Sequence, residues 1–121
     1  MTTVTLFRPV GTKELALIEA SGWRAFPPRL PEQPFFYPVT NEGYAAQIAR
    51  TWNTKHDDKR GFVTRFDVKA EALAGYQRQV VGSRHHEEYW IPAEALEEFN
   101  HAIVGTIQVI AEFSSEENTH A

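Results

Sequence analysis

The sequence contains no cysteine, and this absence excludes disulfide bridges and metal sites built on thiolates. A chain without disulfides fits a reducing cytoplasm. No apolar run reaches the length needed to span a bilayer, and residues 1–4 lack the basic segment that opens a secretory signal peptide. We therefore expect a soluble, cytoplasmic protein without membrane contact.

Basic residues are also few. The chain has 12 lysines and arginines against 16 aspartates and glutamates, so its net charge is −4 with neutral histidines. A protein that binds the backbone of DNA or RNA normally presents a basic face, because much of its affinity comes from the release of counterions. This charge balance argues against a nucleic-acid partner.

Motifs that mark common enzyme classes are missing as well: there is no glycine-rich phosphate-binding loop, no HExxH and no GxSxG. One cluster, His85 and His86 followed by Glu87 and Glu88, suggests a metal. Neighbouring residues of a strand point to opposite faces, however, and no third ligand follows at a standard spacing. We therefore expect a solvated polar turn here and no metal.

The chain has 121 residues, 42% of them hydrophobic, which suits one domain with a single core. The alternation and helical spacing of apolar residues predict an α+β fold. Strands are predicted at residues 4–8, 35–39, 61–68, 78–81, 88–91 and 106–113, and helices at 12–20, 41–53, 70–73 and 92–100. We expect a single domain over residues 1–113 and a flexible tail over 114–121.

Five of the seven prolines fall within residues 27–38, here called the proline-rich segment. Pro28, Pro31 and Pro34 recur every third residue, which is the repeat of polyproline II. We expect a stiff connector, because this spacing is a weak compositional signal. A loop that walls a cleft and a ligand for a proline-binding domain are the functional alternatives.

Two charged residues stand at predicted strand ends. Glu88 opens the strand at 88–91, where alternation puts it on the face of Trp90, so burial of that face would oblige the carboxylate to find a partner. Arg8 closes the first strand and is the best candidate partner for Glu88. On the residues alone a structural role is the simpler interpretation, with Arg8 in a salt bridge and Glu88 solvated at a strand terminus.

Three blocks resemble, in order and character, the plan of the ADP-ribosyltransferase superfamily. Residues 4–8 precede a helix and the Ser-Gly-Trp at 21–23, residues 34–38 precede the helix that carries Tyr44, and residues 88–92 form the third block. Residues 3–113 are also similar to a family of small bacterial proteins that are often labelled as ADP-ribosylation related. The resemblance implies a split antiparallel β-sheet with three or four short helices, and NAD as the substrate.

In that superfamily the first block supplies an Arg or His that contacts NAD, the second an aromatic residue beside the nicotinamide, and the third a Glu. The resemblance therefore implies Arg8, Phe36 or Tyr37, and Glu88, with Tyr44 as a further NAD-binding residue. Phe36 falls where many members keep Tyr, and Tyr37 is one place off. Glu88 is preferred to its neighbour Glu87 because it directly precedes the Tyr-Trp-Ile of the third block. Core packing stays an equal alternative for Phe36 and Tyr44.

The resemblance also implies a chemistry. Cleavage of the bond between nicotinamide and ribose builds positive charge on the sugar, which a carboxylate bonded to a ribose hydroxyl stabilises. Arg8 would hold a phosphate or ribose oxygen, and an aromatic ring would stack on the leaving nicotinamide. The expected function is to bind NAD and to transfer ADP-ribose to an unknown acceptor or to hydrolyse NAD.

Two alternatives remain. One is a non-catalytic binding or interaction module on the same fold, in which Arg8 and Glu88 only support the structure. The other is a transferase that acts on the phosphorylated end of RNA, which the scarcity of basic residues weakens.

Overall fold

The computed structural model describes residues 2–51, 59–80 and 87–114. Its strands are β1 (Thr3–Val10), β2 (Phe35–Phe36), β3 (Arg60–Lys69), β4 (Gln77–Val80), β5 (Glu87–Pro92) and β6 (Ile103–Ser114). Its helices are α1 (Thr12–Ala20), α2 (Glu42–Thr51), α3 (Ala70–Leu73) and α4 (Leu96–His101), and the 3-10 helix η2 (Ala93–Ala95) leads into α4. In the described ranges, no helix has the length and apolar character to cross a membrane.

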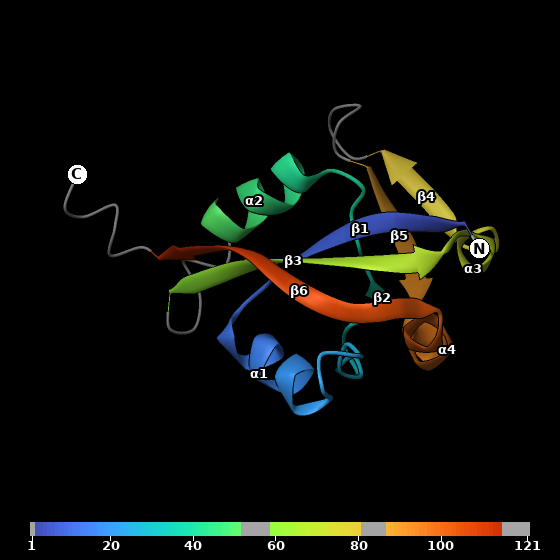
Figure 1. The fold of residues 1–121 in the computed structure, drawn as a ribbon, viewed down its shortest axis with the longest axis horizontal. Helices are drawn as coiled ribbons and strands as arrows, with labels where there is room; N and C mark the ends of the chain where they lie inside the picture. Colours follow the sequence, from blue (N-terminus) through green and yellow to red (C-terminus); the bar gives the residue numbers. More distant parts are fainter. Residues whose placement is uncertain (1, 52–58, 81–86, 115–121) are drawn as a thin grey trace.

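The strands form two antiparallel sheets of three, in the orders β1-β3-β6 and β2-β5-β4 (Figure 1). This arrangement confirms the predicted α+β class. Ser114, predicted as the first residue of the flexible tail, is instead the last residue of β6. The predicted turn that precedes β5 and the rest of the predicted tail, residues 115–121, lie outside the described residues.

Strand β3 is the centre of the first sheet and is buried on both faces. Figure 1 shows α1 on one side of this sheet and α2 on the other. The larger core cluster includes Leu6 of β1, Ile18 of α1 and Phe66 of β3, while a smaller one joins Val63 of β3 to the alanines of α2. Small side chains on α2 let the helix lie close to the sheet. The alternation along residues 61–68 is typical of a strand with one buried face, and this expectation is wrong because Val63 buries the second face under α2.

Strand β1 continues through Pro9 to Val10, two residues past its predicted end. The register explains why proline is tolerated. Phe7 bonds through its N–H and C=O to Val39, away from β3, and residues two apart on a strand present their backbone groups on the same side. Pro9 therefore turns its missing N–H away from β3, and the β1–β3 ladder loses no hydrogen bond.

Two register shifts interrupt the pairing of β3 with β6. An extra residue on one strand reverses the faces of the residues beyond it. Ile107 therefore packs into the larger cluster, whereas Ala111 and Phe113 pack against the cluster under α2, and Val109 between them is 41% exposed. The terminal strand is confirmed, but its simple alternation is wrong.

Val39 joins the two sheets. Its backbone N–H and C=O both bond to Phe7 at 2.8 Å, and a bridge pairs it with Glu88 of β5. Tyr89 donates its N–H to the carbonyl of Pro38 at 2.9 Å. Because Pro38 has no N–H, the predicted strand at 35–39 is divided into β2 and the isolated bridge at Val39. Val39 therefore lies between β1 and the start of β5 and brings the two strands close together.

The predicted helix start at Asn41 is confirmed, whereas the one at Pro92 is wrong. Asn41 caps α2, since its Oδ1 accepts the backbone N–H of Tyr44 at 2.9 Å. Pro92, predicted as the first residue of a helix, is instead the last residue of β5. It pairs there with Phe35 of β2, so η2 and α4 begin only after it.

Candidate functional site

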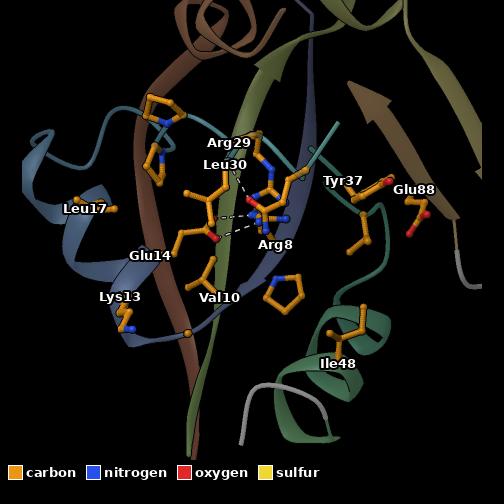
Figure 2. A pocket seen from close by; sticks show the side chains of 16 residues that line it. Arg8, Val10, Lys13, Glu14, Leu17, Arg29, Leu30, Tyr37, Ile48 and Glu88 are labelled. Atoms are coloured by element: carbon orange, nitrogen blue, oxygen red, sulfur yellow. Dashed lines mark hydrogen bonds and ion pairs between the residues drawn. The ribbon is translucent and has the colours of Figure 1, made fainter. Parts of the chain in front are cut away.

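A cavity of about 730 Å³ opens beside the end of β1 (Figure 2). Pockets of roughly 300–1,000 Å³ are typical of small-molecule sites. Its walls come from the end of β1, from α1, from the proline-rich segment and from the joint at Val39, with Ile48 of α2 and Glu88 of β5 completing them. The proline-rich segment thus does more than connect α1 to α2, because six of its residues line the cavity: Pro27, Pro28, Arg29, Leu30, Gln33 and Tyr37.

Arg8 lies in the wall and is only 9% exposed. Its Nε and Nη2 donate to the two carboxylate oxygens of Glu14, at 2.6 and 3.0 Å. This two-point geometry is the strong form of an arginine–carboxylate pair. Glu14 occupies the first turn of α1, where the helix macrodipole favours a negative charge.

The expected pairing of Arg8 with Glu88 is therefore wrong. Gly11 is the one residue between β1 and α1, so the first turn of the helix folds back against the end of the strand. That reversal places Glu14 on Arg8. Arg8 and Glu88 are both described residues and both line the cavity, yet no ion pair joins them. Figure 2 shows Glu88 at the margin of the cavity, beyond Tyr37 as seen from Arg8.

The two aromatic candidates of the second block differ sharply. Phe36 is fully buried and packs on Phe26 and Phe99, with ring centroids at 4.9 and 5.6 Å. The guanidinium of Arg8 lies 4.5 Å from its ring centroid. Phe36 thus belongs to the core and forms a floor under Arg8. Tyr37 lines the cavity instead, so it is the ring of this pair that a ligand in the cavity can contact.

Glu88 is held by neutral donors. Its Oε1 accepts the indole N–H of Trp90 at 3.0 Å, and its Oε2 accepts the hydroxyl of Tyr44 at 3.5 Å. The predicted shared face of Glu88 and Trp90 is confirmed. Burial, followed by the charge and hydrogen bond of Glu88, raises the pKa of Tyr44, so its hydroxyl stays protonated at neutral pH. Tyr44 therefore orients Glu88 from α2.

Glu87 faces away from this carboxylate. It accepts the hydroxyl of Thr40 at 3.1 Å and lies 3.5 Å from the Nε of Arg78 on β4. Successive residues of a strand alternate between faces, and only Glu88 of this pair lines the cavity.

No protein-family model, curated protein or solved structure matches this chain. The geometry of the cavity therefore carries the functional argument.

Arg29, which the sequence analysis did not single out, is the second guanidinium of the cavity. Its Nε donates to the carbonyl of Phe35 at 3.1 Å. Burial and then the neighbouring charge of Arg8 lower the pKa of Arg29, while Glu14 and Tyr37 act in the opposite direction. A guanidinium stays protonated in proteins, so this direction reports first a positive group that is partly withdrawn from water and second the positive charge of Arg8 beside it. A charged residue directly after Pro27 and Pro28 is the only sequence signal for it.

Among residues 2–51, 59–80 and 87–114, no group of three His, Asp or Glu side chains is placed to hold a metal ion. His85 and His86 lie outside those ranges.

Proposed function

We propose that this cavity binds NAD, and that the protein transfers ADP-ribose to an acceptor or hydrolyses NAD with Glu88 as the catalytic carboxylate. The separation of charge along the cavity is the observation that supports this proposal most. Arg8, Lys13 and Arg29 line the side of α1, where Glu14 supplies the one carboxylate among the described residues, and Glu88 lies at the other side. NAD carries the matching pattern, with a negative pyrophosphate and a positive nicotinamide ring.

The aromatic side chains around Glu88 favour the same orientation. Tyr37 and Trp90 meet edge to face with centroids 5.7 Å apart, and Glu88 bonds to the indole of Trp90. A positively charged ring gains both from an aromatic face and from a nearby carboxylate. The nicotinamide would therefore lie at Tyr37 and the pyrophosphate at the α1 side.

The reaction follows from this placement. The bond between the ribose carbon and the nicotinamide nitrogen breaks, and its electron pair leaves with the nicotinamide, which becomes neutral. The ribose then carries positive charge that Glu88 would stabilise through a hydrogen bond to a ribose hydroxyl. Water or an acceptor nucleophile forms the new bond to that carbon and releases its proton. The products are nicotinamide and either free or transferred ADP-ribose.

The path of the strands also supports a split sheet like that of the ADP-ribosyltransferases. Val39 bonds to β1 on one side and to β5 on the other, so the three blocks that carry Arg8, Tyr37 and Glu88 run next to one another. In the superfamily those same three blocks supply the NAD-binding arginine, the aromatic residue and the glutamate.

One observation favours the second function, a non-catalytic binding module. Both carboxylate oxygens of Glu14 engage Arg8, so Arg8 already has a structural role without any ligand. In this alternative the cavity still takes a nucleotide, but Glu88 performs no chemistry.

NAD-dependent thermal stabilisation and nicotinamide release test the two functions. At a concentration about 100-fold above Kd, NAD should add about 2.7 kcal/mol of stability, which is about 10 °C for a domain of this size. Glu88→Gln should lower nicotinamide release by about 100-fold or more and leave the NAD shift intact. Glu87→Gln is the matched control and should keep both.

A wild-type protein that millimolar NAD does not stabilise would overturn the proposal. Stabilisation without nicotinamide release in the wild type would favour the binding module. Equal release by the wild type and Glu88→Gln would remove Glu88 from the mechanism.

A further inference from the structure

The wall formed by α1 and the proline-rich segment combines positive charge with exposed apolar side chains. Leu17 and Leu30 line the cavity and are 55% and 57% exposed. A single exposed leucine is ordinary on a protein surface. Here Leu17 comes from α1 and Leu30 from the proline-rich segment, and both line the same cavity as Arg29. Figure 2 shows Leu30 next to Arg29 and Leu17 farther along α1.

We propose that this wall binds the adenosine diphosphate half of NAD, with Arg29 and Lys13 at the phosphates and Leu17 and Leu30 against the adenine ring. The choice of NAD as the whole ligand rests on the proposed function. Binding of a nucleoside diphosphate to this wall is testable without nicotinamide chemistry.

Arg29 is better suited than Arg8 to contact phosphate. Arg8 is 9% exposed and directs its Nε and Nη2 to Glu14. Arg29 is half-buried, and its Nε bond to the carbonyl of Phe35 fixes the guanidinium in the wall. Its two terminal amino groups make no hydrogen bond to any described residue, and they are the groups that form a two-point contact with a phosphate. Arg8 acts as a positioning residue that keeps positive charge beside Arg29.

The electrostatics favour a ligand with more than one negative charge. Burial lowers the pKa of Arg29 most, and repulsion from the nearby charge of Arg8 lowers it further, while Glu14 offsets only part of that repulsion. A diphosphate brings the charge that the wall lacks. The cavity is partly enclosed by apolar side chains, so this attraction is less screened than on an open surface.

The apolar part of the wall supplies the second half of the recognition. An adenine ring is flat and loses contact with water on both faces when it lies between two aliphatic side chains. Leu17 and Leu30 would fill that role. An inorganic pyrophosphate ion, which has no base, should gain nothing from them.

Isothermal titration with ADP, pyrophosphate and nicotinamide riboside separates the two parts. Arg29→Ala should weaken ADP and pyrophosphate by about tenfold or more and change nicotinamide riboside by less than twofold. Arg29→Lys should recover part of the loss. Arg24→Ala is the matched control, because Arg24 is an exposed arginine that precedes the same segment and does not line the cavity.

The double variant Leu17→Ser, Leu30→Ser should weaken ADP about tenfold and leave pyrophosphate unchanged. Val80→Ser is its control, since Val80 is 56% exposed on β4 and outside the cavity. Thermal melts of each variant establish whether it folds. If Arg29→Ala does not fold, the affinity of Arg29→Lys for ADP still tests the role of Arg29.

The outcomes distinguish this inference from the proposed function. If ADP binding depends on Arg29 and the protein does not release nicotinamide, the proposed ADP-binding role of the wall is supported and the catalytic proposal is wrong. If the protein binds and turns over NAD but has no measurable affinity for ADP, the proposed ADP-binding role of the wall is wrong and the catalytic proposal stands. The same conclusion follows if the affinity for ADP is unchanged in Arg29→Ala and Arg29→Lys. Equal losses of ADP and pyrophosphate in the double leucine variant refute the adenine contact.

Discussion

Replacing Glu14 with glutamine should destabilise the fold and strengthen anion binding at the same time. The side chains of Arg8 and Glu14 are 11% and 20% exposed. Removing one member of a fully buried ion pair costs about 3–5 kcal/mol, and partial exposure of both groups reduces this cost to about 2–3 kcal/mol. Glutamine also replaces one of the two carboxylate oxygens that accept from Arg8 with an NH2 group, which is a donor like the guanidinium that it meets.

Urea unfolding and thermal melts measure this effect. A loss of about 2–3 kcal/mol corresponds to a fall in Tm of about 8–12 °C for a domain of this size. A double-mutant cycle with Arg8→Met isolates the pair, because methionine keeps a long apolar side chain over Phe36 without the charge. In the Arg8→Met background, Glu14→Gln should cost less than about 0.5 kcal/mol.

The affinity of the same variant for ADP gives an independent readout. Among the described residues, Glu14 is the one carboxylate on the α1 side of the cavity, so its replacement by glutamine makes the net charge there more positive by one. ADP should bind several-fold more tightly even though the protein is less stable. A Tm within about 2 °C of the wild type, or a fall in ADP affinity in a folded variant, would refute the reasoning about this pair.

The remaining predictions concern the aromatic residues. Phe36→Leu should lower the free energy of unfolding in urea by about 1–2 kcal/mol and leave the affinity for NAD within twofold. Tyr37→Ala should weaken NAD binding in a titration and change stability little. The reverse pattern would show that Phe36, and not Tyr37, contacts the ligand. Burial and Glu88 raise the pKa of folded Tyr44, so its share of stability is complete below the unfolded value near pH 10 and is lost as pH rises through the folded pKa. Tyr44→Phe should therefore lose less stability than the wild type between about pH 9 and pH 11, and parallel unfolding curves would contradict this.

Local patterns in the sequence predicted much of the fold. Alternation with period two put Glu88 on the face of Trp90, and this placement follows from strand geometry alone. The cap at Asn41 follows from the preference of a single residue type. Each of these features depends on residues within a few positions of one another.

The features that the sequence did not predict depend on the angle at which the chain reverses or on how distant segments meet. The partner of Arg8 is set by the chain reversal at Gly11, and alternation carries no information on that angle. The change of face along β6 comes from its register with β3. Arg29 reaches the cavity because the proline-rich segment lines it, and the bond from its Nε to the carbonyl of Phe35 holds the guanidinium there. The predicted polyproline II repeat is interrupted by a turn in which Gln33 donates its N–H to the carbonyl of Leu30.

The error over the partner of Arg8 bears directly on the proposed chemistry. An arginine paired with Glu88 would neutralise the charge that must stabilise a positive ribose, and it would compete with the ribose hydroxyl for the same oxygens. Trp90 and Tyr44 orient Glu88 through neutral donors and leave its negative charge in place. Glu14, and not Glu88, is the carboxylate that pairs with Arg8, and this pair holds the Arg8 guanidinium on the α1 side of the cavity. Two separate acids, one paired and one not, are what a cavity needs if it is to hold a pyrophosphate at one side and promote the loss of nicotinamide at the other.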